Sequence, residues 1–312
     1  MSMLSSVAER LYWMARYLER TEDTARLIKT YNHLIMDIPK GAEPPWDIMI
    51  DILDAQSMFR ARFKVGSEQN VLKFLIADDK ATCGIPFAAR AMRENVRTTR
   101  DVLPEEAWEL VNGLHLFVES EAARSSGRRH RHHFLSEVIG RCQMINGLIG
   151  ASLPRDHAYG FIKLGRLIEC TDMTTRVMDV AAGDIMNRAG RFGTIEPLLW
   201  GSLLQVLSAA GAYRREVGPI VEKAATLNFV LRSTEFPRSI KYCVRETRKE
   251  LMRLKNHDFA IRATERLRRR LARLDVEQVT REELHYYVDN FQQQLNRLDA
   301  AIHATWFHGE SA

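Results

Sequence analysis

Charged and tyrosyl side chains recur every three or four residues near the start of the chain. They are Glu9, Tyr12, Arg16, Glu19, Asp23 and Arg26. On an α-helix this spacing places them in one stripe, where residues one turn apart pair, as Arg16 with Glu19 or Asp23 with Arg26. Arginine binds carboxylates and phosphates bidentately, and a glutamate of raised pKa acts as a general base. Three interpretations stay open: a solvated face of paired charges, a buried network that sets helix register, and a polar pocket for an anion.

The same residue types recur later in the chain. Residues 16–26 and 166–176 share five identities in eleven positions, which match Arg16, Glu19 and Arg26 with Arg166, Glu169 and Arg176. Exposed ion pairs contribute little and tolerate exchange for other polar residues. The recurrence of Arg and Glu therefore favours the interpretations as a buried network or a pocket over that of a solvated face.

Further matches follow in the same order along both halves. Trp46 faces Trp200, 154 positions later, and Pro86 faces Pro237, 151 positions later. Ordered matches that include two of the five tryptophans indicate a tandem duplication. The sequence predicts a six-helix unit of about 150 residues present twice, as helical repeats 1–153 and 154–312 packed into one compact unit about a pseudo-two-fold axis.

Apolar residues three or four apart predict helices along the whole chain. After a first helix that ends before Pro39, the patterns cover 46–63, 68–78, 84–102, 105–126, 131–152, 156–188, 196–217, 219–232, 237–255, 258–274 and 280–306. No sustained alternation typical of strands occurs, so the predicted fold class is all-α.

A second charged stripe lies on the helix predicted over 84–102. Arg90, Arg93 and Arg97 stand three or four residues apart with Glu94 beside them, and Arg238 lies just before the matching helix of the second half. Neighbouring arginines repel one another unless an anion faces them. Pairing with the acidic residues of the first helix is the simplest explanation. An anionic ligand and an acidic protein surface are the alternatives.

Four strings of the sequence resemble the Alpha-E family, an all-helical domain named for its Glu-Arg motifs. They are MLSSVAERLYWMARYLERTEDTARL at the start, FIKLGRLIECTDMTTRVMD, RENVR at 93–97 and FPRSI at 236–240. The resemblance extends from Met3 to about Trp306. It implies that Glu9-Arg10 and Glu19-Arg20 are the Glu-Arg positions, with Cys170 in place of the arginine expected after Glu169.

The resemblance also implies a functional setting. Members of the family are typically encoded beside a circularly permuted ATP-grasp ligase and a transglutaminase-like protease. We therefore expect a noncatalytic partner of an ATP-grasp-type amide or peptide ligase, docking through the Glu/Arg stripes, with such a protease as a second partner. The alternative is an enzyme acting on a carboxylate- or phosphate-bearing, peptide-like substrate, with Glu19 or Glu169 as the catalytic residue. Surrounding arginines argue against the enzyme because they lower the pKa of a glutamate.

Composition argues against several other classes. A net charge of +5 over 312 residues is a weak signal for nucleic acid, and no apolar stretch reaches the ~20 residues that a membrane helix needs. The four cysteines lie far apart, which suits a reducing cytoplasm. Nucleotide, hydrolase and zincin motifs are absent from the sequence, so no cofactor or metal is expected. The string RRHRHH at 128–133 predicts a basic loop rather than a zinc site.

Overall fold

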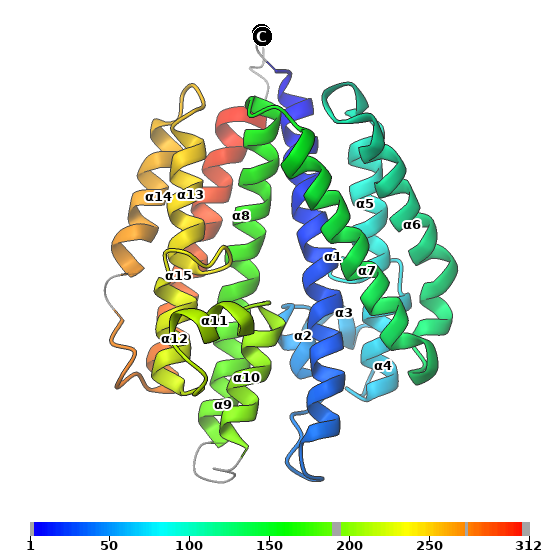
Figure 1. Ribbon diagram of the computed structural model, residues 1–312, viewed down its shortest axis with the longest axis vertical. Coiled ribbons are helices and arrows are strands. Elements are labelled where there is room, and N and C mark those ends of the chain that lie inside the picture. Colours follow the sequence, from blue (N-terminus) through cyan, green and yellow to red (C-terminus); the bar gives the residue numbers. More distant parts are fainter. Residues whose placement is uncertain (1–2, 189–194, 272–273, 308–312) are drawn as a thin grey trace.

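The computed structural model describes residues 3–188, 195–271 and 274–307, and every regular element within these ranges is a helix. The all-α prediction is confirmed. Two helices, α1 (Ser5–Asp37) and α8 (His157–Val177), lie side by side in the middle of the molecule (Figure 1). One flank is formed by α5 (Ile85–Arg97), α6 (Glu105–Ser125) and α7 (Arg128–Ser152). The other is formed by α13 (Ile240–Leu251), α14 (Asp258–Leu271) and α15 (Arg281–Ile302).

Shorter helices connect these long ones. In the first half they are α2 (Ile48–Ile52), α3 (Gln56–Arg60) and α4 (Glu68–Leu72), followed by a π-helical turn (Lys73–Ala77) and, after α5, a 3-10 turn (Arg100–Val102). In the second half α8 continues through a π-helical turn (Met178–Ala182) into α9 (Gly183–Arg188). Then come α10 (Glu196–Val206), α11 (Ala210–Glu216) and α12 (Lys223–Arg232), and a π-helical turn (His303–Phe307) follows α15.

The helix α1 is buried on most of its circumference because it packs against α5, α7 and α8. It ends where the sequence predicts. Ile38 adopts extended backbone (φ −91°, ψ 139°), the conformation that a residue before proline prefers. Polar side chains are numerous among its buried residues, and Arg16, Glu19, Glu22 and Asp23 are all included. These side chains require partners from the neighbouring helices.

The predicted helices 46–63 and 196–217 are each broken in two. Asp54 (φ 52°) and Ser208 (φ 56°) adopt left-handed backbone, and they stand 154 positions apart. The amide of the next residue, Ala55 or Ala209, then donates to a carbonyl five residues back, at 3.0 and 2.7 Å. Left-handed residues end helices in this way. The same break therefore occurs at matching positions, while the duplication itself stays a prediction.

Helices α1 and α8 cross closely at Gly165. A Cβ atom at this position would lie 2.2 Å from the carbonyl oxygen of Tyr12, far inside van der Waals contact. Glycine is needed here because only a residue without a side chain allows the two backbones to approach.

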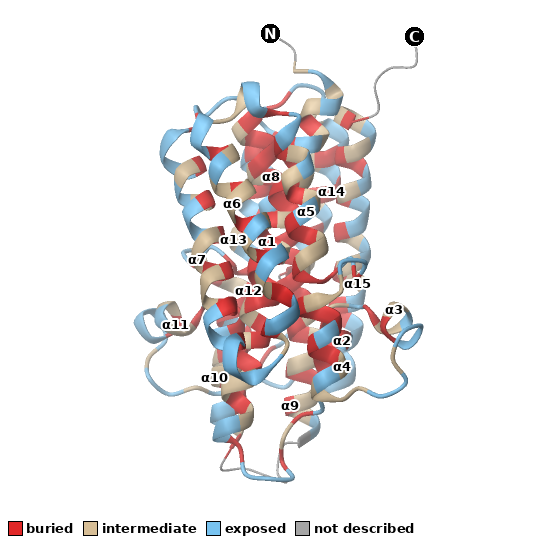
Figure 2. Ribbon diagram, turned by 90° about the vertical axis from the view of Figure 1, so that its right-hand side faces the viewer, coloured by how far each residue is buried: buried red, intermediate tan, exposed pale blue. Residues whose placement is uncertain are grey.

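One cluster of buried apolar side chains extends from Ala8 in α1 to Phe307 after α15. Figure 2 shows buried positions concentrated on the inward sides of the long helices. The core therefore continues across the contact between α1 and α8. The boundary predicted after residue 153 falls in the turn between α7 and α8, and the division into two repeats stays a prediction.

Candidate functional site

The contact between α1 and α8 contains a cluster of charged side chains, which we call the central Glu–Arg network. It comprises Arg16, Glu19, Arg20 and Asp23 of α1, Arg166 and Glu169 of α8, and Arg238 from the segment before α13. Glu19 is fully buried and Glu169 is 4% exposed. Burying a charge is costly unless it is paired and hydrogen-bonded, so the partners of these carboxylates decide what the network does.

Glu169 is held by two arginines of α1. Arg16 donates from Nε to its Oε2 at 2.7 Å, and Arg20 donates from Nε to its Oε1 at 2.6 Å. Arg16 also donates from Nη1 to Asp299 of α15 at 3.0 Å, and the Tyr12 hydroxyl donates to the same carboxylate oxygen. These bonds connect α1 to α8, and they connect both helices to α15.

Glu19 is held by arginines of the second half of the chain. Arg166 donates from Nε to its Oε2 at 3.1 Å, and the Cys170 thiol donates to its Oε1 at 3.0 Å. Arg238 contacts Oε1 through Nη2 and donates from Nη1 to Asp23 at 2.7 Å. Both oxygens of the Glu19 carboxylate are therefore occupied by donors from α8 and from the start of α13.

The two glutamates exchange partners between the halves. Arg16 pairs with Glu169, and Arg166, 150 positions after Arg16, pairs with Glu19. Helices related by a two-fold axis place equal positions opposite each other, which produces reciprocal pairs of this kind. The pairing of Arg16 with Glu19 expected within one helix is wrong, because α8 offers Arg16 a buried carboxylate across the interface.

The cysteine that follows Glu169 is compensated by an arginine from elsewhere in its half. Thr24 donates to the carbonyl of Cys83 at 3.2 Å, and Thr174, 150 positions later, donates to that of Arg238 at 3.1 Å. Cys83 and Arg238 therefore occupy equivalent places. In the first half an arginine follows the glutamate and a cysteine precedes α5. In the second half the two residue types are exchanged, so each glutamate still has two arginines.

This equivalence corrects the sequence alignment before α5 and α13. The two helices begin at Ile85 and Ile240, 155 positions apart, which is also the separation of Cys83 and Arg238. Pro86 lies in the first turn of α5, whereas Pro237 precedes α13. The alignment of Pro86 with Pro237 is therefore wrong. It assumes a separation of 151 positions, whereas the two helices begin 155 positions apart.

The arginines keep both glutamates ionised. Burial raises the pKa of Glu169, but Arg20 and Arg16 outweigh burial and lower that pKa to about 2. Burial likewise opposes ionisation of Glu19, and Arg238 and Arg166 bring its pKa below the ordinary value. A carboxylate of such low pKa is a poor proton acceptor at neutral pH. Neither glutamate is suited to be a general base, and the geometry matches the buried network among the three interpretations.

Asp23 behaves differently from the two glutamates. Burial raises its pKa, although Arg238 opposes the shift, and its Oδ2 has no hydrogen-bond partner within the described ranges. The predicted pairing of Asp23 with Arg26 is wrong: Arg26 contacts Glu22, four residues before it on the same helix. Asp23 instead faces the start of α13 and pairs with Arg238.

The arginine stripe of α5 lies outside the network. Arg90 donates to Asp79 at 3.3 Å, while Arg93 and Arg97 bind Glu94 at 2.7 and 2.9 Å. Their predicted pairing with the acidic residues of the first helix is wrong. The reason is that the apolar face of α5 packs against α1, which leaves the arginines on the outer face of the helix.

Three further predicted residues also lie away from the two glutamates. Glu9 is half-buried near the start of α1, and the exposed Arg10 donates to Thr98. Arg176 donates to Asp172, one turn before it, at 2.9 Å. The first Glu-Arg pair of the sequence is therefore not part of the central Glu–Arg network, whereas the second, Glu19-Arg20, is central to it.

The predicted basic loop at 128–133 is wrong, because α7 begins at Arg128. Gly127 precedes it with extended backbone (φ −78°, ψ 153°), and Arg131 turns inward and is 6% exposed. In the part of the chain that the structure describes, no group of three or more His, Cys, Asp and Glu side chains is placed to hold a metal ion.

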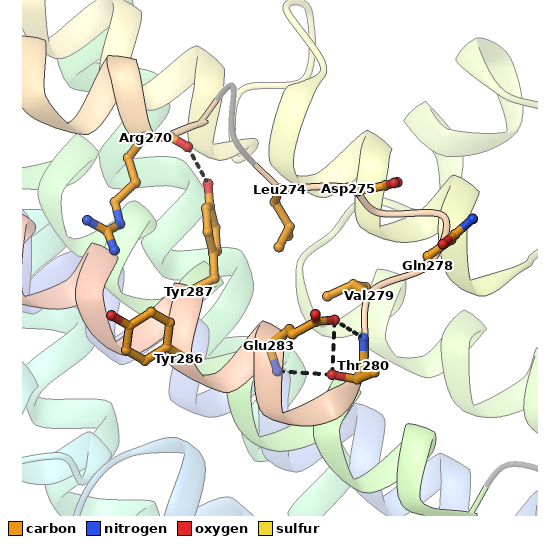
Figure 3. Close-up of a pocket in the computed structure, with 9 residues that line it drawn as sticks. All are labelled: Arg270, Leu274, Asp275, Gln278, Val279, Thr280, Glu283, Tyr286 and Tyr287. Atoms are coloured by element: carbon orange, nitrogen blue, oxygen red, sulfur yellow. Dashed lines mark hydrogen bonds between the residues drawn. The ribbon is translucent and has the colours of Figure 1, made fainter.

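A cavity of about 520 Å³ lies beside the connection between α14 and α15 (Figure 3). None of the residues predicted from the sequence lines it. Glu283, one of the two carboxylates that line it, accepts hydrogen bonds from the amide and hydroxyl of Thr280 at the start of α15, and these bonds lower its pKa. The Tyr287 hydroxyl donates to the carbonyl of Arg270 at 3.4 Å. These polar groups serve the local structure of the helix ends.

Two groups of partners were not predicted from the sequence. Asp299 joins the network from α15, at a distance of 283 residues from Arg16. Lys163 binds Glu246 and Glu250 of α13, both at 2.9 Å, and provides an ionic contact between α8 and α13 outside the network. No sequence spacing links such distant positions, so only a pattern of paired substitutions among relatives could have indicated them.

Comparisons with known proteins identify one family. The Alpha-E model, described as a predicted alpha-helical domain with a conserved ER motif, matches residues 3–307. No curated protein and no solved structure matches the chain. Among the described helices, none is long and apolar enough to span a membrane.

Proposed function

Because the chain belongs to the Alpha-E family, we propose that it is a noncatalytic helical partner of an ATP-grasp-type amide or peptide ligase. The transglutaminase-like protease expected from the same resemblance is proposed as a second partner. The four buried cysteines, all free thiols, support a place of action in the reducing cytoplasm.

The central Glu–Arg network supports a noncatalytic role. Its two glutamates are buried, ionised and already bound by arginines, so they are not available to a substrate. For the same reason they cannot form the docking surface that the sequence suggested. The network instead holds α1, α8 and the start of α13 together, so we look for the proposed docking surface on the outer helices.

The distribution of exposed charge supports one choice of surface. Every exposed side chain of α13 is basic: Lys241, Arg245, Arg248 and Lys249. The adjacent helix α14 adds four exposed arginines: Arg262, Arg266, Arg268 and Arg269. Some of these residues pair with Glu246 or Glu265, but eight cations outnumber these two carboxylates. We call this surface the basic face, and we propose that it docks on an acidic surface of the ligase.

The test is co-purification with a circularly permuted ATP-grasp ligase from the same organism. Arg262 and Arg266 are exposed and have no ion-pair partner within the described chain, so we expect reversal of both charges (R262E with R266E) to preserve the fold. The matched control is K64E with R129E, which makes the same change of charge at two exposed residues of the first half.

We expect the first pair of substitutions to abolish co-purification and the control pair to leave it unchanged. If both variants co-purify with the ligase equally well, the docking surface is not the basic face. Failure of the unmodified protein to co-purify would contradict the partnership itself. Adding salt should weaken the complex, because attraction between exposed charges is screened.

A further inference from the structure

A cleft of about 360 Å³ is lined mainly by residues from the C-terminal half of α1 and the N-terminal end of α7. The helix α7 lies on the opposite flank of the molecule from α13 and α14, which carry the basic face (Figure 1). We call it the α1–α7 cleft. Its polar lining is largely basic: Lys29, His33, Arg128, Arg131 and His132. Its apolar lining includes Met36, which is 74% exposed, and Trp46.

The cations of this cleft exceed its carboxylates. Glu68 is its only acidic lining residue, and it accepts from both Arg128 (2.8 Å) and Arg131 (3.0 Å). Lys29 donates to the Ser136 hydroxyl at 2.9 Å, and no carboxylate of the described residues lies within ion-pair distance of its Nζ. The cleft therefore has a net positive charge and a lysine whose charge is unmatched.

One buried donor atom and one helix N-terminus add positive character to this region. Arg131 is 6% exposed, and its Nε is buried without a hydrogen-bond partner in the described chain, although both of its Nη atoms are bound. The helix α7 starts at the cleft with no side-chain cap from Gly127 and no acidic residue in its first turn. An uncapped helix N-terminus carries partial positive charge and attracts anions.

A pair of histidines adds pH sensitivity. The rings of His33 and His132 stack with their centroids 5.5 Å apart, and Nε2 of His33 lies 3.5 Å from Nδ1 of His132. Burial, Lys29, His33 and the adjacent His133 lower the pKa of His132. Among the described residues that line the cleft, Glu68 is the only acid, and Arg128 and Arg131 already bind it. A bound anion would compensate the positive charge, so anion binding and protonation of His132 favour each other.

From these observations we propose that the α1–α7 cleft binds a small organic oxyanion, a carboxylate or a phosphate. Its charged end lies at Lys29 and the histidine pair, and its apolar group lies against Trp46 and Met36. The volume is at the lower end of the range of about 300–1,000 Å³ for ligand pockets, which suits a molecule of the size of an aromatic acid. This site is independent of the basic face and of the proposed partnership.

Isothermal titration calorimetry tests the proposal on the full chain at about pH 5 and about pH 8, well below and well above the ordinary histidine pKa of about 6.5. The probes are benzoate, phenyl phosphate, inorganic phosphate and neutral benzyl alcohol. The variants are Lys29→Met and His132→Gln. The matched control is His130→Gln, which changes an exposed histidine of the same helix that does not line the cleft.

We expect benzoate or phenyl phosphate to bind more tightly at the lower pH, and the stronger of the two identifies the preferred anion. Lys29→Met should weaken binding about tenfold, the effect of losing one charged contact of about 1.4 kcal/mol. His132→Gln should remove most of the pH dependence, and His130→Gln should have no effect. Inorganic phosphate should bind less well than phenyl phosphate, because it makes no apolar contact.

Three results would overturn the proposal. The first is no heat of binding with any probe. The second is binding of benzyl alcohol as tight as that of benzoate, which would show an apolar crevice without anion recognition. The third is binding that Lys29→Met and His132→Gln leave unchanged, which would place the anion elsewhere. Thermal unfolding of each variant, followed by circular dichroism, establishes that a loss of binding is not a loss of fold.

Discussion

Substitution of Glu169 by Gln removes one charge from the central Glu–Arg network while it preserves the shape of the side chain. The arginines lower the pKa of Glu169 from 4.5 to about 2, which corresponds to about 3 kcal/mol in favour of the ionised form. Removal of one member of a buried ion pair costs about 3–5 kcal/mol, in agreement with this value. We therefore expect Glu169→Gln to lower the free energy of unfolding by about 3 kcal/mol at pH 7.

The pH dependence provides a second test of the same substitution. The pKa of Glu169 is lower in the folded chain than in the unfolded chain, so its stabilisation is fully present above the unfolded value of 4.5. It is lost as the pH falls through the folded value of about 2. Glutamine does not titrate. The difference in unfolding free energy between the two proteins should therefore decrease to less than half by about pH 3.

The assay is urea unfolding followed by circular dichroism and by tryptophan fluorescence, at several pH values. Glu94→Gln is the matched control, because Glu94 also binds two arginines but lies on the exposed face of α5. Exposed pairs contribute at most about 1 kcal/mol, so the control should change stability little. A loss below 1 kcal/mol for Glu169→Gln, or a loss that does not depend on pH, would refute the reasoning.

Two other predictions follow from the packing of α1 and α8. Gly165→Ala should destabilise the protein by about 1–3 kcal/mol, because its Cβ would overlap the carbonyl of Tyr12. Gly160→Ala on the same helix should be neutral or stabilising, because its Cβ would meet only Leu254, at 3.9 Å. Equal effects of the two substitutions in urea unfolding would exclude the close contact at Gly165. All four cysteines are buried, and burial raises the pKa of each thiol, that of Cys83 to about 11. A disulfide-exchange reagent should therefore modify none of them rapidly until urea unfolds the chain. Rapid modification of one thiol in the folded protein would contradict this prediction.

The sequence predicts the fold class and most of the helices because both follow from local spacing. Apolar residues three or four apart bury one side of each helix whatever its neighbours are. The two long helices predicted over 46–63 and 196–217 are interrupted at Asp54 and Ser208 in the structure. Left-handed backbone at an aspartate or a serine has no strong local signal, and here the surrounding packing decides it.

The residues of the central network are predicted better than their partners. Recurrence of Arg16 and Glu19 as Arg166 and Glu169 singles out the correct side chains, but pairing within one helix is the wrong geometry. A stripe of charges looks the same in sequence whether it faces water or a second stripe. The crossing of α1 and α8 decides between the two, and that crossing depends on contacts between distant segments.

The partners of Glu19 near Cys170 likewise depend on contacts between distant segments. Read locally, a cysteine in place of arginine suggests that the second Glu-Arg site is lost. In the structure Arg238 arrives from the segment before α13 and restores a second arginine for Glu19, while Cys83 occupies the equivalent place in the first half. The charge at each glutamate is maintained, although the segment that supplies it has changed.

A double-mutant cycle on Arg16 and Glu169 tests most directly whether the central Glu–Arg network holds the two halves together. Urea unfolding of Arg16→Met, Glu169→Gln and the double variant gives the coupling free energy between two side chains whose Nε and Oε2 atoms lie 2.7 Å apart. The buried contact predicts a coupling of more than about 1 kcal/mol, within the range of about 0.5–3 kcal/mol for residues in contact. Additive effects of the two substitutions, with a coupling below about 0.3 kcal/mol, would contradict it.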